Sequence, residues 1–125
     1  MNLRNFFLLS FVVGLLFALG LLLGASTVLG LFKIKAGPAE SVVAQLLGAA
    51  LIVPALISWF ARDVSEPASR TAVVFPLFLF NAIGFVVSLL AVLSKAVSVN
   101  GWIVVALFLL FALGFGYFQF FRTAD

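Results

Sequence analysis

Four long apolar runs, separated by three short polar connections, make up almost the whole chain. The runs cover residues 6–32, 41–60, 71–93 and 102–121, and none of them contains a charged side chain. Because a helix rises 1.5 Å per residue, about 20 residues cross the ~30 Å hydrocarbon core of a bilayer. The pattern therefore predicts an all-α integral membrane protein of one domain, a four-transmembrane-helix up-and-down bundle with short loops.

The first run is longer than one crossing requires, so we expect its helix to tilt or to project from the bilayer. Arg4 followed by apolar residues is also the order found in secretory signals. A signal has an apolar core of only about 7–15 residues, which is much shorter than this run. The sequence therefore predicts a retained first helix.

The composition supports a membrane environment and narrows the chemistry. The chain is 66% hydrophobic and only 9% charged, whereas a soluble domain carries about 25% charged residues. Its basic residues are scattered singly, so the net charge of +3 forms no patch for nucleic acid. Cysteine and histidine are absent, which removes disulfides and the usual zinc and haem ligands. With no histidine base and no ionisable group inside a run, we expect no metal, no required cofactor and no enzymatic activity.

Charges beside the runs set the expected orientation. An even number of helices puts both termini and the second connection on one side, where the basic residues are Arg4, Arg62, Arg70 and Arg122. The basic residues on the other side are Lys33, Lys35 and Lys95. Since basic residues gather in the cytoplasm, we expect cytoplasmic termini in a bacterial cytoplasmic membrane. The carboxylates Asp63 and Glu66 stand beside two of these arginines, which predicts solvated ion pairs.

Small residues recur four apart along every run, and this spacing lets helix backbones approach closely in lipid. Residues 20–24 form a GxxxG sequence. We expect helices of this chain, or of neighbouring chains, to pack through these small residues: Gly14, Ala18, Gly20, Gly24, Ala44, Gly48, Gly84, Ser88, Ala112 and Gly116.

Two amides, Asn81 and Gln45, share helical faces with these small residues. One interpretation is hydrogen bonding between helices; the other is polar contact with a ligand bound between helices, such as a sugar, quinone or pigment. Pro54 and Pro76 interrupt helical hydrogen bonding, and we expect them to shape the bundle or, alternatively, a binding site.

Phenylalanines line one face of the fourth run, where they either fill space or grip a flat ring. The candidates for contact with a bound lipid, quinone or pigment are therefore Asn81, Gln45, Phe108, Phe111 and Phe115.

Three stretches of the chain resemble a family of small bacterial four-span membrane proteins, loosely similar to DoxX-like proteins. They are "VAQLLGAALIVPALISWFARD", "SRTAVVFPLFLFNAIGFVVSLLAVLS" and "GWIVVALFLLFALGFGYF". The resemblance rests on apolar texture and a few small residues. It implies four helices and brings no catalytic or ligand motif.

Two functions follow as hypotheses. The first is a non-enzymatic subunit that acts through helix–helix association, as an accessory or assembly component of a larger membrane complex, for which photosynthetic and respiratory complexes are candidates. Its expected partners are membrane lipids and other transmembrane helices. The second is a homo-oligomeric carrier or binding protein for a small hydrophobic ligand, with Asn81 and Gln45 as polar contacts.

Overall fold

The computed structural model describes residues 2–35 and 37–121, and these are almost entirely helical. In chain order the elements are α1 Leu3–Leu23, α2 Ala25–Leu31, α3 Pro38–Phe60, α4 Pro67–Leu93, α5 Gly101–Gly116 and the π-helical turn η1 Tyr117–Phe121. No strand occurs among the described residues. Four helices, namely α1, α3, α4 and α5 with η1, are long and apolar enough to cross a membrane. The predicted fold class, an all-α four-span bundle, is confirmed.

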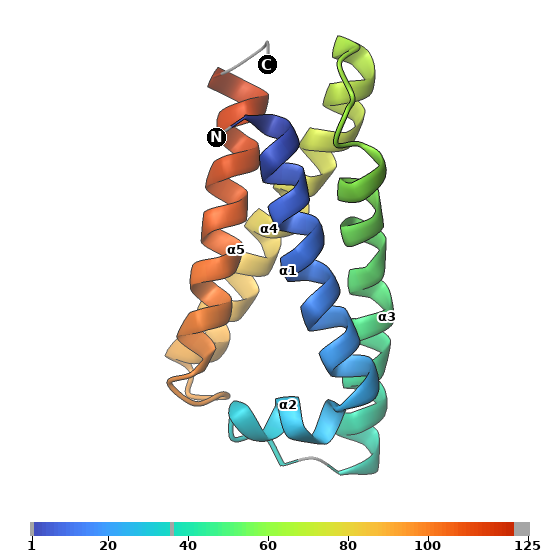
Figure 1. The fold of residues 1–125 in the computed structure, drawn as a ribbon. Helices are drawn as coiled ribbons and strands as arrows, with labels where there is room; N and C mark the ends of the chain where they lie inside the picture. The colour runs from blue at the N-terminus through green and yellow to red at the C-terminus, as the bar shows by residue number, and fades with distance from the viewer. Residues whose placement is uncertain (1, 36, 122–125) are drawn as a thin grey trace.

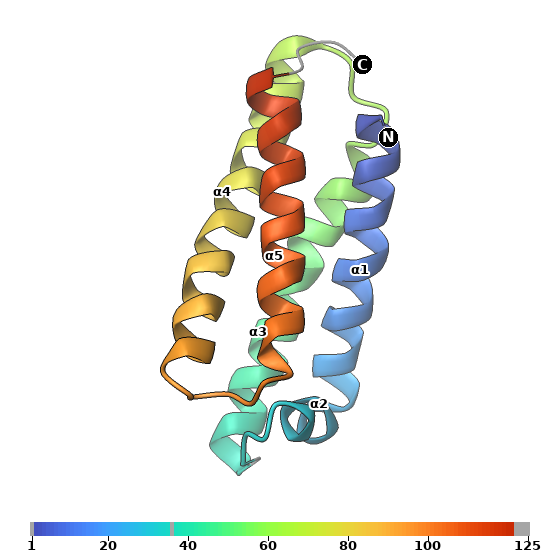
Figure 2. The ribbon, with the colours of Figure 1, turned by 90° about the vertical axis from the view of Figure 1, so that its left-hand side faces the viewer.

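The four long helices form two hairpins. Figures 1 and 2 show α1 beside α3 and α4 beside α5, and these two pairs are in close contact along their lengths. In Figure 1, α4 starts near the last turns of α3 and then passes diagonally behind α1 until it lies behind the first turns of α5. This crossing makes α3 and α4 diverge from their shared connection.

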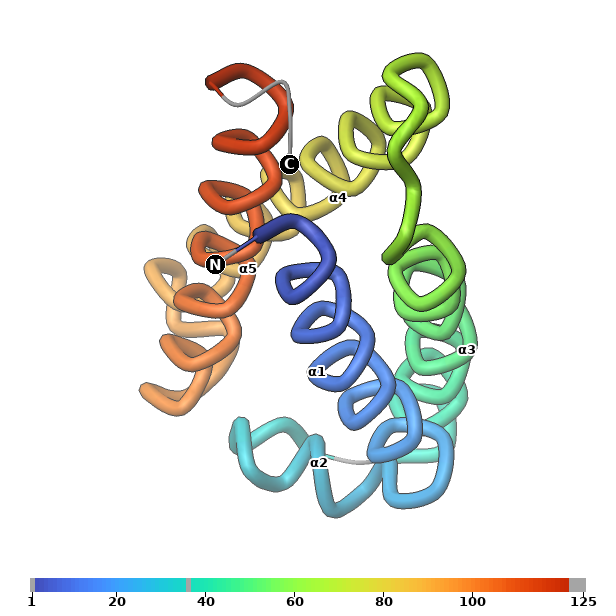
Figure 3. The backbone as a smooth tube through the Cα atoms, turned by 45° about the horizontal axis from the view of Figure 1, so that its top comes forward, coloured from blue at the N-terminus to red at the C-terminus, as the bar shows by residue number. Residues whose placement is uncertain are grey.

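The hairpins meet mainly at the end of the bundle that holds Leu3 and Phe121, called here the terminal end. Figures 1 and 3 show the first turns of α1 beside α5 at this end. Apolar side chains from α1, α4, α5 and η1, together with Ala61 just after α3, fill the space between them: Leu3, Phe6, Phe7, Ala61, Val74, Leu77, Phe111, Phe115 and Phe118. We call this set the aromatic cluster.

The first apolar run does not form one long helix, and the predicted span 6–32 is wrong in this respect. Helical geometry breaks at Gly24, with φ −140° and ψ 48°, and α2 then runs across the other end of the bundle, called here the α2 end (Figure 1). Glycine is the poorest helix former after proline, so a break at this position costs little helical stability. The extra length forms the separate helix α2 across the α2 end of the bundle.

The helix α4 begins four residues earlier than the predicted span, which started at Thr71. Glu66 is its N-cap: the carboxylate accepts hydrogen bonds from the backbone N–H groups of Ala68 at 3.3 Å and Ser69 at 3.2 Å. The expectation of a solvated ion pair for Glu66 is therefore replaced by a capping role. The earlier start also brings Arg70 into the first turn of α4, where it is buried.

Candidate functional site

The small residues of α1 and α3 face each other inside the first hairpin. A Cβ atom at Gly14 would lie 3.3 Å from Cβ of Ala55, and one at Gly48 would lie 2.8 Å from the carbonyl oxygen of Ala18. Ser10 and Ser58 place their hydroxyl oxygens 3.1 Å apart across the same interface. Of the predicted packing residues, Gly14, Ala18 and Gly48 thus lie between α1 and α3 of one chain.

Gly20 and Gly24, the GxxxG pair, lie at the break between α1 and α2. Gly24 donates its backbone N–H to the Gly20 carbonyl at 2.8 Å, and a Cβ atom at Gly20 would lie 3.5 Å from the Val28 side chain of α2. Ala44 is buried near this break, in a small cluster with Leu21 and Ala25. These glycines therefore lie where α2 turns away from α1 and crosses the α2 end.

Glycines also admit rings between α4 and α5. A Cβ atom at Gly84 would lie 2.4 Å from the Phe108 ring, and one at Gly116 would lie 3.0 Å from the Phe78 ring. Ala112 on α5 is buried as well, whereas Ser88 bonds within α4, where it donates to the Gly84 carbonyl at 2.7 Å.

The structure divides the phenylalanine stripe of α5 between two neighbours. Phe111 and Phe115 contact Phe6 of α1, with ring centroids 5.5 and 4.8 Å apart. Phe108 instead lies against Gly84 of α4. The stripe therefore fills the space between helices of this chain.

Gly114, absent from the predicted set, completes the contact between α1 and α5. A Cβ atom there would lie 2.0 Å from Cζ of Phe6, whose ring is held by three α5 and η1 phenylalanines. The signal in the sequence was Gly114 itself, a glycine next to Phe115 and outside the face of Ala112 and Gly116.

Asn81 and Gln45 do not share a site. Asn81 is buried, and its side-chain nitrogen donates to the Leu77 carbonyl of its own helix at 2.8 Å. Gln45 lies on the exposed surface of α3, beside the exposed Ala49 one turn further on. Among the described residues, the Gln45 side chain has no hydrogen-bond partner.

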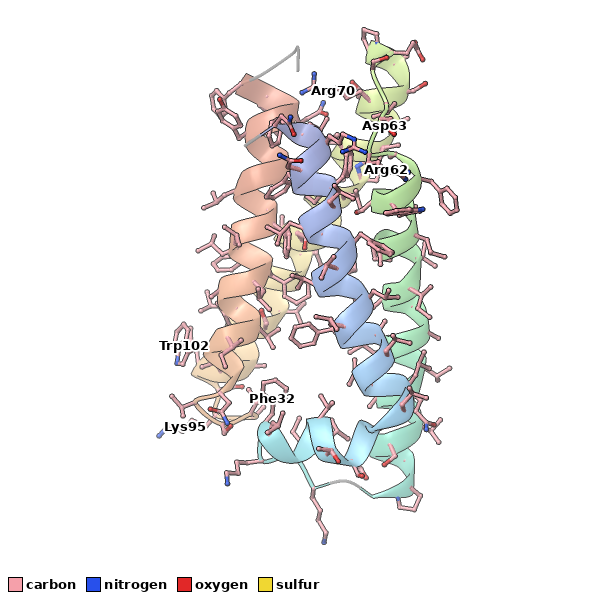
Figure 4. The ribbon with its side chains drawn as sticks, viewed as in Figure 1. Phe32, Arg62, Asp63, Arg70, Lys95 and Trp102 are labelled. Atoms are coloured by element: carbon pink, nitrogen blue, oxygen red, sulfur yellow. The ribbon has the colours of Figure 1, made fainter. Side chains whose placement is uncertain are left out.

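Charged residues of the terminal end gather around the α3–α4 connection (Figure 4). Arg4 Nε lies 2.7 Å from Oδ1 of Asp63, and Arg62 Nε lies 3.9 Å from Oδ2. The hydrogen bond from Arg4 holds the pKa of Asp63 below its ordinary value. The guanidinium of Arg62 stacks on the Trp59 ring, 3.8 Å from its centroid, and donates to the Trp59 carbonyl.

Arg70 has a structural role that the sequence did not predict. Its side chain is only 8% exposed, and Nη2 donates to the Phe118 carbonyl in η1 at 3.1 Å. This bond ties the start of α4 to the end of the fourth span. The sequence placed Arg70 in a connection, and only the earlier start of α4 gives it this position.

An apolar groove lies where α3 and α4 diverge from their connection. Its lining residues come from α3, the connection and α4, and all but Asp63 are apolar: Val53, Leu56, Ile57, Phe60, Ala61, Asp63, Val64 and Val73. The charged residue of the groove is Asp63, which pairs with Arg4 and lies near Arg62. No group of three or more His, Cys, Asp or Glu side chains able to hold a metal occurs within residues 2–35 and 37–121.

No family model, curated protein or solved structure matches this chain. The resemblance to small DoxX-like proteins therefore stays a prediction from the sequence. What the structure establishes is the class of protein, an integral membrane protein with four apolar helices.

Proposed function

We propose that this protein is a non-enzymatic accessory or assembly subunit of a larger membrane complex, which binds its partner through the exposed face of α3. The single observation that carries the proposal is the Gln45 side chain, an amide on the exposed surface of an apolar helix that has no hydrogen-bond partner among residues 2–35 and 37–121. Gln45 follows Glu40 by five residues, so it lies about 7.5 Å deeper along α3.

An amide in hydrocarbon lacks the hydrogen bonds that water would supply, and a neighbouring transmembrane helix can supply them. Ala49 lies one turn further along the same face, and its small side chain lets a second backbone approach closely. Gly14, Gly48 and Ala55 are already used inside the hairpin. Gln45 and Ala49 are exposed and remain available to another helix.

The test is gentle purification from native membranes, followed by sizing and mass spectrometry of everything that remains bound. We expect a defined complex larger than one chain, and its loss in Gln45→Leu and in Ala49→Leu. Ala106→Leu is the matched control, because Ala106 is an exposed alanine on α5, away from this face. A particle of one chain in the native protein, or a complex that survives both α3 substitutions, contradicts the proposal.

We also propose that the protein resides in the bacterial cytoplasmic membrane with its termini in the cytoplasm. The terminal end carries Arg4, Arg62 and Arg70, while the α2 end carries lysines. Because the chain has no cysteine, single cysteines at Asn2 and Lys35 report each side without background. An impermeant maleimide applied to intact cells should label Lys35→Cys only. Labelling of Asn2→Cys alone would show that the orientation is the opposite one.

A further inference from the structure

We propose that the groove between α3 and α4 binds one phospholipid with an ethanolamine head group, its acyl chain in the groove and its head group on Arg62 and Asp63. The site lies near the opposite end of α3 from Gln45, so it is independent of the surface proposed for helix association. Its two parts, an apolar groove and a charged end, match the two parts of an amphiphile.

The groove is apolar enough for an acyl chain, because seven of its eight lining residues are apolar. It is open to the surface and has a volume of about 670 Å³. Val53 and Phe60 line it and are 58% and 78% exposed, so the groove opens on the surface of the bundle. They are seven residues apart, so the groove extends about 10 Å along α3. In a bilayer, a lipid chain is the molecule that can fill such a surface groove.

The phosphate has a partner in Arg62. Its guanidinium is fixed on the Trp59 ring at 3.8 Å and by its bond to the Trp59 carbonyl. A guanidinium has five N–H donors, and this one uses few of them inside the chain. The Arg62 side chain remains 25% exposed. It is therefore an ordered cation with donors left for a phosphate oxygen.

The ammonium group has a partner in Asp63. Arg4 occupies Oδ1 at 2.7 Å, whereas Oδ2 lies 3.9 Å from Arg62, beyond hydrogen-bond distance. The Asp63 side chain is 66% exposed, and the bond from Arg4 keeps it ionised. Oδ2 can thus accept from a primary ammonium, whereas the trimethylammonium of a choline head group has no N–H to donate, and a glycerol head group has no cation.

Native mass spectrometry of the purified full chain tests the proposal, with dioleoyl phosphatidylethanolamine, phosphatidylcholine and phosphatidylglycerol added separately at equal concentration. We expect the ethanolamine lipid to occupy one site at least about threefold more than either other lipid. Asp63→Asn should abolish that preference and leave chain binding. Val53→Phe fills the groove and should lower the occupancy of all three lipids, whereas Val42→Phe, at a 53% exposed position of α3 outside the groove, should not.

Equal occupancy by the ethanolamine and choline lipids overturns the assignment of the head group, as does a preference that survives Asp63→Asn. Equal lipid binding by Val53→Phe and Val42→Phe overturns the assignment of the groove. Circular dichroism confirms that each variant keeps its helices. The size of the complex in native membranes, which tests the α3 face, is measured separately, so either proposal can fail without the other.

Discussion

The two ends of the bundle are built in different ways. At the terminal end the hairpins share the aromatic cluster, in which Phe7, Val74 and Phe115 are fully enclosed. At the α2 end the small cluster of Leu21, Ala25 and Ala44 joins only α1, α2 and α3. There the described residues link the two hairpins by hydrogen bonds to carbonyl groups at the end of α2, not by a shared apolar core.

The links at the α2 end are specific. The Asn100 side chain donates to the Leu31 carbonyl at 2.6 Å, and the Ser98 backbone N–H donates to the Phe32 carbonyl at 3.0 Å. These bonds satisfy the last carbonyl groups of α2, which have no partner within the helix. The terminal end is thus stabilised by ring packing that tolerates no added atom. The α2 end is stabilised by a few polar contacts.

The largest expected effect is at the terminal end. Gly114→Ala puts a Cβ atom against the Phe6 ring, which cannot move because other rings surround it. We expect a loss of about 1–3 kcal/mol in the free energy of unfolding, the usual cost of overpacking, measured by unfolding in mixed micelles of SDS. Gly30→Ala is the control at the α2 end, since a Cβ atom there meets nothing within 4 Å. An equal loss of unfolding free energy in both variants would contradict the proposed difference between the two ends.

The next effect is a gain of stability at the α2 end. Lys33 and Lys95 have left-handed backbone conformations, with φ 59° and 63°, just after α2 and α4. At each position the next residue donates its N–H back into the helix, as in Schellman caps. Because glycine adopts this conformation without strain, Lys33→Gly and Lys95→Gly should each raise the free energy of unfolding by about 0.5–1 kcal/mol. Lys35→Gly is the matched control, and an equal gain there would contradict the explanation.

A smaller effect is expected where α2 meets the α4–α5 connection. Asn100→Leu removes the 2.6 Å bond to the Leu31 carbonyl and should cost about 0.6 kcal/mol overall. Amide hydrogen exchange should accelerate in α2 and stay unchanged in the half of α5 that carries Phe111 and Phe115. Faster exchange throughout both regions would show that the two ends are not independent.

The smallest effect is the response of the terminal end to acid. Hydrogen bonds from Arg4 to Asp63, and from Ser69 to Glu66, lower the pKa values of these carboxyl groups from 3.8 and 4.5. Since the folded-state pKa values lie below the unfolded ones, their contribution is present above about pH 4.5 and is lost as the pH falls through the folded values. The melting temperature should drop slightly between pH 6 and pH 3. Asp63→Asn with Glu66→Gln should flatten this drop, and an unchanged drop would assign it to other groups.

The candidate site shows how far sequence patterns reach within a helix. The spacing of Gly14, Ala18 and Gly48 predicted close packing, and these residues do lie where helices touch. The same reasoning treated Asn81 and Gln45 as equivalent candidates for helix or ligand contact, although Asn81 is buried and Gln45 is exposed. Helical periodicity defines which residues share a face, but it does not define which neighbour that face meets.

The four apolar helices follow from the amino-acid sequence alone, because only a backbone that satisfies its own hydrogen bonds can cross hydrocarbon. The sequence also determined which end carries arginines and which carries lysines. Only the tertiary structure decided that α1 breaks at Gly24, that Phe6 packs on Gly114, and that a groove with Asp63 at its end opens between α3 and α4. These features depend on contacts between segments far apart in the chain, and in lipid such contacts are selected by the fit of surfaces rather than by hydrophobicity.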